Sequence, residues 1–263
     1  MSYDRFNKPC KITNPTNLPV ESRKINEIPV YSVNTFALSK ISNMELNTVI
    51  FDIDGLLVDS EPLWNEAASE VFKQYGVNLT EEQYKTTTGL RTKEFVQWWF
   101  SYYNLGSEEL AIAEKKIVHS VLNKIEHKGK MMPGVQYIFE FFAKKGFKTG
   151  LATSSPPALI DLVVGMTGIK KYLHATASAE ELAYGKPHPQ VYLNCAALLK
   201  SNPTECICFE DSFNGMISVK AARMKCVIVP HASQAKEERW SAADLKLSSL
   251  QNFGELHFNL LNP

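Results

Sequence analysis

The sequence predicts an α/β fold, in which a parallel sheet is covered by helices and interrupted by one all-helical insertion. Two observations favour this class. After Pro133 and Gly134, short β-prone runs alternate with helical patterns, as in chains that build parallel sheets. Before that point, a single β-prone run is followed only by apolar stripes of helical period. We therefore expect a core made from residues 45–61 and 132–263 and a helical module at 62–131.

Residues 1–44 hold several prolines among Asn, Ser and Lys, and they show no sustained period. We expect a flexible arm or an incorrectly assigned start, with Met44 as the true first residue, and a targeting segment is the alternative. The first strand is predicted at 48–51, because Thr, Val, Ile and Phe favour extended structure. It ends at an Asp-Ile-Asp-Gly tetrad.

The insertion begins with a helix expected from Pro62 to about Tyr75. Two further helices are predicted around residues 95–103 and 110–125, where apolar side chains recur at helical spacing. We interpret most of the aromatic residues of this region as core packing, and we include Trp98 and Trp99.

Helices and strands then alternate along the rest of the core. Helices are predicted at 135–145, 157–166, 189–200 and 214–224, and strands at 147–153, 174–177, 205–209 and 226–229. A helical insertion after the first strand would lie over the carboxyl edge of the sheet. That edge is where open α/β sheets bind their ligands.

The chain has 263 residues with 28 basic and 28 acidic side chains, so it carries no formal net charge. This balance argues against a nucleic-acid partner, since such domains usually carry a basic excess. No apolar run approaches the roughly 20 residues that cross a bilayer, and the first residues contain no continuous apolar run of the kind found in secretory signals. We expect a cytoplasmic monomer without a membrane partner, whose five cysteines are reduced core residues and form no zinc site.

The strongest chemical signal is the pair Asp52 and Asp54, which follows the first predicted strand. In an extended segment both side chains point to the same side, because side chains alternate. Two carboxylates that close repel each other unless a cation intervenes, and Mg²⁺ prefers oxygen ligands and substrate phosphate. One carboxylate then attacks phosphorus, while its neighbour protonates the leaving oxygen. The alternative is a solvated turn, in which Gly55 only permits the backbone to bend.

Further polar groups follow later elements of the predicted core. Thr153 and Ser154 end a strand, and a hydroxyl there donates to phosphate oxygens. Lys186 lies in a loop pinned by two prolines and offers a compact positive charge. Glu210 and Asp211 follow the next strand. Each has an ordinary alternative, such as a surface lysine or a helix cap, but all of them converge on one edge of one sheet.

In this order, the motifs resemble those of the haloacid dehalogenase superfamily of phosphohydrolases. The resemblance covers about residues 46–250, and within the superfamily the chain is similar to the β-phosphoglucomutase-like sugar phosphatases. It is carried by four stretches, at residues 51–64, 88–91, 186–192 and 210–216. The resemblance implies a three-layer, Rossmann-like core with an inserted helical cap domain.

The resemblance also implies roles for individual residues. Asp52 is the expected nucleophile, and Asp54 is the expected general acid/base. The expected cofactor is Mg²⁺, held by Asp52, Asp211 and the backbone carbonyl of Asp54, with Glu210 supporting the metal shell. The groups expected to bind phosphate are Thr153, Ser154 and Lys186.

These roles predict a Mg²⁺-dependent phosphatase that forms an aspartyl-phosphate and whose partner is a small-molecule ester, a sugar or sugar-alcohol phosphate of the hexose 6-phosphate type. The mutases of the subgroup carry a His where this chain has Trp64 and a Lys in the cap loop near Thr88, and this chain lacks both. Both absences argue against a phosphosugar mutase, which is the alternative. Asp54 argues against dehalogenation, because a carbon–halogen bond needs no protonated oxygen leaving group. A catalytically silent binding protein is a third interpretation.

The cap is expected to choose the substrate. Glu61 and Trp64 begin the cap and are predicted to line its entrance, and Arg91 is predicted to contact the sugar. The alternatives are packing in the cap core for Trp64 and a surface position for Arg91.

Overall fold

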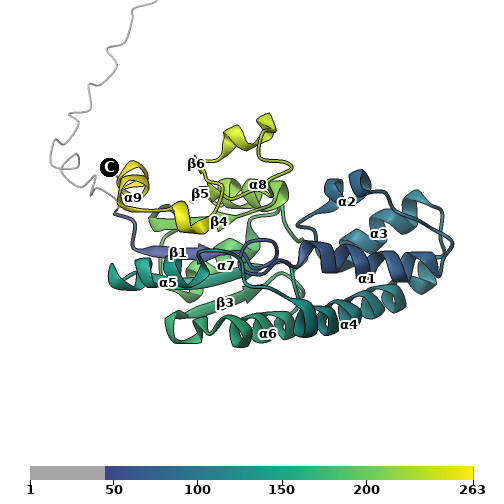
Figure 1. Cartoon of the computed structure of the whole chain (residues 1–263). Coiled ribbons are helices and arrows are strands. Elements are labelled where there is room, and N and C mark those ends of the chain that lie inside the picture. The colour runs from purple at the N-terminus through teal and green to yellow at the C-terminus, as the bar shows by residue number, and fades with distance from the viewer. Residues whose placement is uncertain (1–44, 263) are drawn as a thin grey trace, which may run out of the picture. The chain divides into compact units, whose positions relative to one another are not determined.

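The computed structural model describes residues 45–262 (Figure 1). The predicted arm or misassigned start at 1–44 lies outside the described residues. Within them, six strands form one sheet in the order β3-β2-β1-β4-β5-β6, and every neighbouring pair is parallel. The strands are β1 (Thr48–Phe51), β2 (Lys148–Thr153), β3 (Ala175–Ser178), β4 (Cys206–Glu210), β5 (Lys225–Ile228) and β6 (Leu245–Lys246). The predicted parallel α/β sheet is therefore confirmed.

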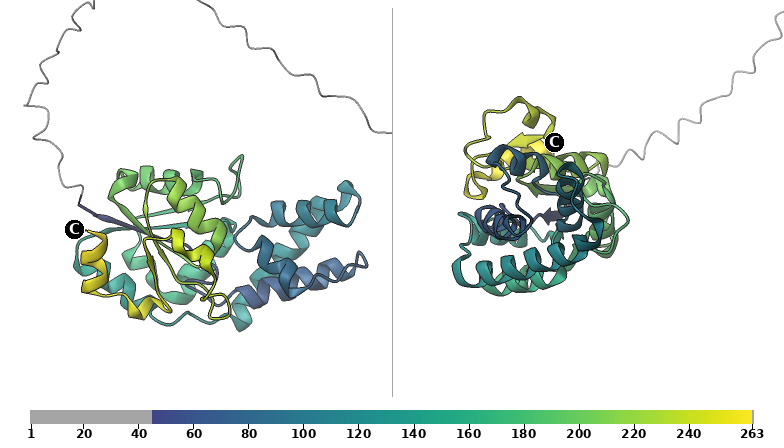
Figure 2. Two further views of the ribbon diagram at one scale, coloured as in Figure 1. Left: turned by 90° about the horizontal axis from the view of Figure 1, so that it is seen from above. Right: turned by 90° about the vertical axis from the view of Figure 1, so that its right-hand side faces the viewer.

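Helices cover both faces of this sheet and make a three-layer core (Figure 2). On one face pack α5 (Val135–Lys144), α6 (Pro157–Thr167) and α9 (Glu255–Leu261), and on the other α7 (Gln190–Leu198) and α8 (Phe213–Ala221). Each of the four residues of β1 is buried, as is typical of a parallel strand between two helical layers.

The two faces of β1 belong to two apolar clusters, because its side chains alternate. Phe51 faces the first cluster, where its ring stacks on Phe139 at 4.5 Å and on Phe209 at 5.0 Å between ring centroids. Ile50 faces the second cluster, together with Tyr192. This packing fixes the carboxyl end of β1, and with it the position of Asp52, the next residue.

The inserted helices are α1 (Glu61–Lys73), α2 (Glu81–Thr87), α3 (Thr92–Tyr102) and α4 (Leu110–Lys128), and they lie beyond the carboxyl ends of the strands (Figure 1). Their aromatic core is formed by edge-to-face contacts of Phe72 with Phe95 and Phe100. Trp99 is buried as predicted. The prediction for Trp98 is wrong: its side chain is 60% exposed, because it lies on the outer side of α3.

The chain leaves the sheet and returns to it at one place. Asp59 N–H donates to the carbonyl of Lys130, and Met132 N–H donates to that of Leu57. The helices of the insertion end at Lys128, close to this crossing. The exact domain boundaries at residues 62 and 131 stay a prediction.

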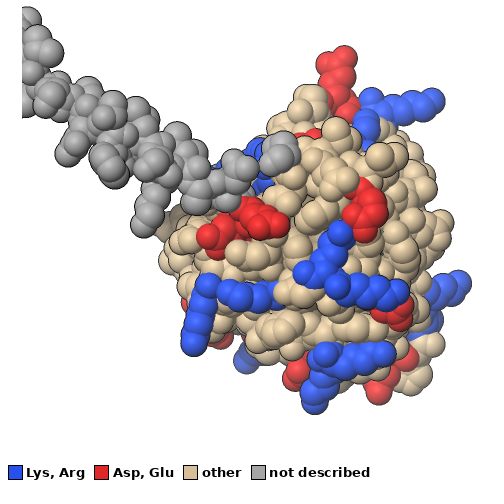
Figure 3. Space-filling model, turned by 90° about the vertical axis from the view of Figure 1, so that its left-hand side faces the viewer, with Lys and Arg blue, Asp and Glu red and all other residues tan. Residues whose placement is uncertain are grey.

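Short 3₁₀ segments complete the described chain, at Ser107–Glu109, Ile169–Tyr172, Pro203–Glu205, Glu238–Ala242 and Leu250–Asn252. Among the helices of residues 45–262, none combines the length and apolar character that a bilayer crossing requires. The cysteines that the structure describes are free and buried, as predicted, and burial raises the pKa of the Cys195 and Cys206 thiols. On the face of the molecule away from the insertion, basic and acidic side chains are interspersed (Figure 3).

Candidate active site

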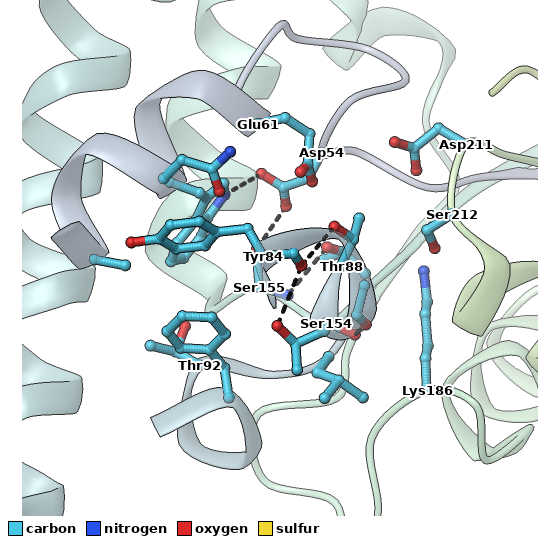
Figure 4. Close-up of a pocket in the computed structure, with 18 of the residues that line it drawn as sticks. Asp54, Glu61, Tyr84, Thr88, Thr92, Ser154, Ser155, Lys186, Asp211 and Ser212 are labelled. Atoms are coloured by element: carbon cyan, nitrogen blue, oxygen red, sulfur yellow. Dashed lines mark hydrogen bonds between the residues drawn. The ribbon is translucent and has the colours of Figure 1, made fainter. Parts of the chain in front are cut away.

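A cavity lies between the inserted helices and the carboxyl ends of the central strands (Figure 4). The labelled side chains of Asp54, Lys186 and Asp211 point into it from three different segments. From the core, the cavity is lined by Asp52, Asp54, Thr153, Ser154, Ser155, Lys186, Asp211 and Ser212. From the insertion, it is lined by residues that include Glu61, Trp64, Asn65, Ala68, Tyr84, Thr88 and Phe95.

Asp52 and Lys186 form a buried ion pair at the base of this cavity. Lys186 Nζ lies 2.5 Å from Asp52 Oδ1 and 2.6 Å from Glu210 Oε1, and it also donates to the carbonyl of Ala152 at 3.1 Å. Burial works against the charged form of Lys186, but the carboxylates of Asp52 and Glu210 outweigh it and raise the pKa of Lys186. The lysine is therefore a fixed cation beside the predicted nucleophile.

Glu210, at the end of β4, is fully buried and holds this lysine in place. Its Oε1 also accepts from Tyr192 Oη at 2.6 Å, and its Oε2 accepts from Ser212 Oγ at 3.2 Å and from the N–H of Asp211 at 3.2 Å. Gly215 passes so close that a Cβ there would overlap the Glu210 carboxylate. Both oxygens of Glu210 are thus already hydrogen-bonded within the protein.

Three carboxylates, those of Asp52, Glu210 and Asp211, each bring one oxygen within 4.8 Å of the others. Burial raises the pKa of Asp52 well above its usual range; Lys186 opposes this rise, and Glu210 adds to it. Burial, followed by the charge of Glu61, raises the pKa of Asp211 in the same direction. One lysine does not balance this negative charge. A hard cation with oxygen ligands, such as Mg²⁺, fits the donor set and would favour the ionised carboxylates.

Asp54 takes part in a different network, because its carboxylate is turned toward the start of the insertion. Its Oδ1 accepts from Ser60 Oγ and from Trp64 Nε1, both at 2.7 Å, and its Oδ2 accepts from Ser155 Oγ at 2.6 Å. Strand alternation does not place this residue, since β1 ends at Phe51. Asp54 therefore lines the cavity but stands apart from the acidic cluster.

The turn after Asp54 requires glycine for two reasons. Gly55 has a φ of +69°, a conformation that L-residues with a side chain adopt only under strain. A Cβ at this position would also overlap the carboxylate of Asp211. The turn thereby brings the first strand's acidic segment into contact with the loop after β4.

The predicted phosphate-binding hydroxyls lie at the carboxyl end of β2, as expected from the sequence. Thr153 is buried, lines the cavity and accepts from the N–H of Ser155 at 3.1 Å. Ser154 lines the cavity as well, but its hydroxyl donates to the carbonyl of Gly89 in the insertion at 2.8 Å.

The residues predicted from the cap have different positions. Glu61 and Trp64 line the cavity, and burial, followed by the charge of Asp54, raises the pKa of Glu61 to about 7. Arg91 is not among the cavity-lining residues. Its guanidinium is buried against core carbonyls, including that of Ala179 at 3.0 Å. The alternative of a surface position is wrong, because Arg91 is buried. Its guanidinium also lies outside the cavity in which the sugar was expected.

Sequence reasoning missed four residues that shape the site: Ser60, Asn65, Ser155 and Tyr192. Ser155 follows Ser154 in a run already marked as a strand end, and Ser60 lies in the stretch that carries the resemblance. These two could have been included from their position alone. Tyr192 is a buried helix residue, and no local pattern distinguishes it from an ordinary core tyrosine.

The structure combines a parallel sheet, a helical insertion over its carboxyl edge and an acidic cluster paired with a buried lysine. These features define the class of hydrolases that have a Rossmann-like core and an inserted helical cap. A model of the haloacid dehalogenase-like hydrolases matches residues 49–229. The chain belongs to this family. The match confirms the resemblance seen in the sequence, and together with the phosphatases among the relatives it assigns the chain to the phosphoric monoester hydrolases.

Among the relatives, the chain is 38% identical to hexitol phosphatase B of Escherichia coli K12 over 207 residues, 78% of this chain and 93% of that protein. The four stretches named above led us to expect a hexitol phosphatase as a counterpart, and this relative confirms that expectation. A phosphorylated carbohydrates phosphatase of Thermotoga maritima is 29% identical and covers 67% of this chain and 82% of its own length.

Solved structures show the same fold. CbbY from Rhodobacter sphaeroides, solved in complex with phosphate, superposes with a TM-score of 0.73 at 21% identity, over 81% of this chain and 98% of its own. A β-phosphoglucomutase from Clostridium difficile superposes with a TM-score of 0.72 at 21% identity, over 82% and 97% of the two chains. At this identity the likeness concerns the fold, which includes the inserted helices.

Proposed function

We propose that this chain is a Mg²⁺-dependent phosphatase that hydrolyses a small sugar or sugar-alcohol phosphate through an aspartyl-phosphate on Asp52. One observation carries the proposal. Asp52 and Asp211 lie with Lys186 at the base of a cavity that the inserted helices cover, so a nucleophile, a cation site and a fixed positive charge surround one space. The relatives named above, which are phosphatases of hexitols and carbohydrates, support the substrate class.

Each side chain of the site has a distinct part in this reaction. Asp52 attacks phosphorus, and Lys186 holds the Asp52 carboxylate and neutralises charge on the transferring phosphoryl group. Thr153 and the backbone N–H groups beside it donate to phosphate oxygens. Asp54 gives a proton to the leaving oxygen and later takes one from the attacking water.

Asp52, Asp211 and the backbone carbonyl of Asp54 would hold Mg²⁺, which supplies positive charge against the phosphate and the carboxylates. Without that charge, burial favours the protonated form of Asp52, as its raised pKa shows. The protonated carboxyl is a poor nucleophile. In this proposal Glu210 acts on Lys186, since its oxygens accept from that lysine, from Tyr192 and from the loop after β4.

The far end of the substrate is proposed to be uncharged and rich in hydroxyls. Of the cavity-lining residues in the described chain, only Lys186 carries a cationic side chain, and it is paired with Asp52. The wall formed by the insertion instead offers the carboxyl of Glu61, which is hydrogen-bonded to Thr88, and the side-chain amide of Asn65. For this amide, residues 45–262 provide no hydrogen-bond partner. A second phosphate or a carboxylate would find no counter-charge there. Sugar hydroxyls would find both donors and acceptors.

The same charge argument disfavours the alternative, a phosphosugar mutase. That reaction has to hold a bisphosphate, and the insertion provides no lysine or arginine side chain to the described cavity wall. We further propose that the chain acts as a cytoplasmic monomer without a nucleic-acid or membrane partner. The absence of formal net charge supports the exclusion of a nucleic-acid partner.

A phosphate-release screen tests the proposal. Hexitol and hexose 6-phosphates, sugar bisphosphates and phosphoglycolate are compared with and without Mg²⁺. We expect the neutral monoesters to be the best substrates, and we expect Asp52→Asn to abolish their Mg²⁺-dependent hydrolysis. Wild-type turnover in that variant contradicts the mechanism. A preference of the wild-type protein for bisphosphates contradicts the substrate class. Isomerisation of β-glucose 1-phosphate in the presence of a bisphosphate primer, without net phosphate release, would establish the mutase.

A further inference from the structure

Arg91 and Glu94, at the start of α3, join the insertion to the segment that leads to Lys186. Arg91 Nη1 donates to the carbonyls of Ala179 at 3.0 Å and of Leu182 at 2.5 Å, and both carbonyls belong to the core loop after β3. Arg91 Nη2 lies 2.6 Å from Glu94 Oε1. A cation from the insertion is therefore enclosed by core backbone oxygens, and its own neighbour balances its charge.

Glu94 extends this contact to the residue before the lysine. Its Oε1 also accepts from the N–H of Gly185 at 3.0 Å, and its Oε2 accepts from the N–H of Arg91 at 3.3 Å. Burial raises the pKa of Glu94, but the hydrogen bonds from Arg91 and Gly185 lower it by more. The carboxylate thus stays ionised and accepts hydrogen bonds from both the insertion and the core, across a contact that we call the seam.

Gly185 packs closely against the side chains of Glu94 and Arg91. A Cβ at Gly185 would lie 2.5 Å from Glu94 Oε2 and 2.8 Å from Arg91 Nε. The next residue is Lys186, whose Nζ lies against Asp52 and Glu210. The other hydrogen bonds that residues 180–185 make in the described chain are local, such as that from Glu180 N–H to Ser178 Oγ. Arg91 and Glu94 therefore fix the backbone from which the lysine extends.

We propose that Arg91 and Glu94 are positioning residues that place Lys186 for phosphate when the insertion is docked on the core. This inference rests on the proposed function, in which Lys186 binds the phosphoryl group. Its physical basis is that charge-assisted hydrogen bonds across the seam set the position of the Lys186 backbone, so the insertion and the phosphate site act together. The pair touches neither the phosphate nor Asp52.

The structure offers a matched control for this role. Asn214 Nδ2 donates to the carbonyl of Thr88 at 2.8 Å, so it also docks the insertion on the core, but through the start of α8. Loss of that contact weakens the docking without a direct effect on the segment of Gly185. Arg91→Met and Asn214→Ala thus separate placement of the lysine from docking in general.

The experiment measures inhibition by inorganic phosphate at saturating Mg²⁺, together with the melting temperature of each full-length variant. Arg91→Met removes the hydrogen bonds to Ala179 and Leu182 and the ion pair with Glu94. We expect it to raise the Ki of phosphate roughly tenfold or more. Glu94→Gln is expected to raise it by about threefold, since the amide oxygen still accepts from Gly185. Asn214→Ala is expected to leave Ki within about twofold of wild type, and Arg91→Lys is expected to recover part of the loss.

An unchanged Ki in Arg91→Met, or an equal rise in Asn214→Ala, overturns the inference. If Arg91→Met fails to fold, Glu94→Gln decides, and an unchanged Ki in that folded variant also overturns it. Failure of the proposed function is a separate result, because then the wild-type protein itself neither hydrolyses sugar phosphates nor is inhibited by phosphate.

Discussion

Replacement of Trp64 by Phe tests whether the hydrogen bond to Asp54 serves catalysis. The indole Nε1 is one of three donors to this carboxylate, at 2.7 Å, and Phe keeps most of the ring while it removes the donor. A hydrogen bond to a charged group contributes about 1.5–3 kcal/mol. We take the lower value because Trp64 is only partly buried. This value corresponds to a roughly tenfold fall in kcat for a sugar-alcohol phosphate.

The assay compares two leaving groups, because Asp54 is proposed to protonate the leaving oxygen. An alkyl ester such as a hexitol phosphate needs that proton, whereas p-nitrophenolate leaves without one. We expect Trp64→Phe to slow the alkyl ester more than p-nitrophenyl phosphate. Trp98→Phe is the matched control, since that indole is 60% exposed and on the outer side of α3. Equal loss with both esters, or wild-type rates with both, refutes the proposed role of the indole.

Three further predictions concern the turn, the cation and the cavity wall. Gly55→Ala is expected to lower the free energy of unfolding in urea by clearly more than Gly76→Ala. Both glycines have positive φ, but only at Gly55 would a Cβ meet the Asp211 carboxylate. Equal losses in the two variants, roughly 1–2 kcal/mol from backbone strain alone, would contradict this prediction. Addition of Mg²⁺ is expected to raise the melting temperature of the wild-type protein and not that of Asp211→Asn, and an equal rise in both would show that the ion binds elsewhere. In EDTA, Glu61 is expected to make stability fall as pH rises from about 4.5 to above 7, because its pKa of about 7 is raised in the folded state, which therefore binds the proton more tightly than the unfolded chain. Urea titrations at pH 5 and pH 8 check this. The difference should become smaller in Glu61→Gln but not vanish, because the pKa values of Asp52 and Asp211 are raised as well; an unchanged difference would contradict the contribution of Glu61.

The sequence was sufficient to predict which residues meet at the carboxyl edge of the sheet. In a parallel sheet, the carboxyl ends of neighbouring strands share one edge. Asp52 and Asp211 follow β1 and β4, Thr153 is the last residue of β2, and these three strands are adjacent. The order of motifs along the chain therefore implied their proximity. The alternation of strands and helices after Pro133 likewise predicted β2 to β5 to within one residue, but it did not predict the two-residue strand β6.

The order of motifs and the alternation of elements do not predict where a side chain points or how the insertion packs against the core. Arg91 follows a glycine in a loop, and only the fold shows that the loop after β3 offers it carbonyl oxygens. Trp98 and Trp99 are adjacent and equally apolar, yet one is exposed and the other buried, since the turn of α3 separates their faces. Asp54 was placed by strand alternation, but the turn after β1 and the donors Ser60 and Ser155 decide its direction.

Glu210 raises a choice between two roles, and a single variant distinguishes them. The family resemblance implies that it supports the metal shell, and one of its oxygens does belong to the acidic cluster with Asp52 and Asp211. In the structure, however, both oxygens accept hydrogen bonds, one from Lys186 and Tyr192 and the other from the loop after β4. An oxygen that shares itself between a lysine and a tyrosine is a weak additional ligand, because those donors compete with the cation for its lone pairs.

Glu210→Gln keeps the shape of this side chain and removes its charge. If Glu210 serves Lys186, the variant raises the Ki of phosphate about tenfold or more and leaves the Mg²⁺ concentration for half-maximal activity nearly unchanged. If Glu210 serves the metal, the Mg²⁺ requirement rises first, while phosphate inhibition at saturating Mg²⁺ stays as in the wild type. The fully buried ion pair favours the first outcome, since a lysine deprived of one of its two carboxylates loses part of what keeps it charged and in place.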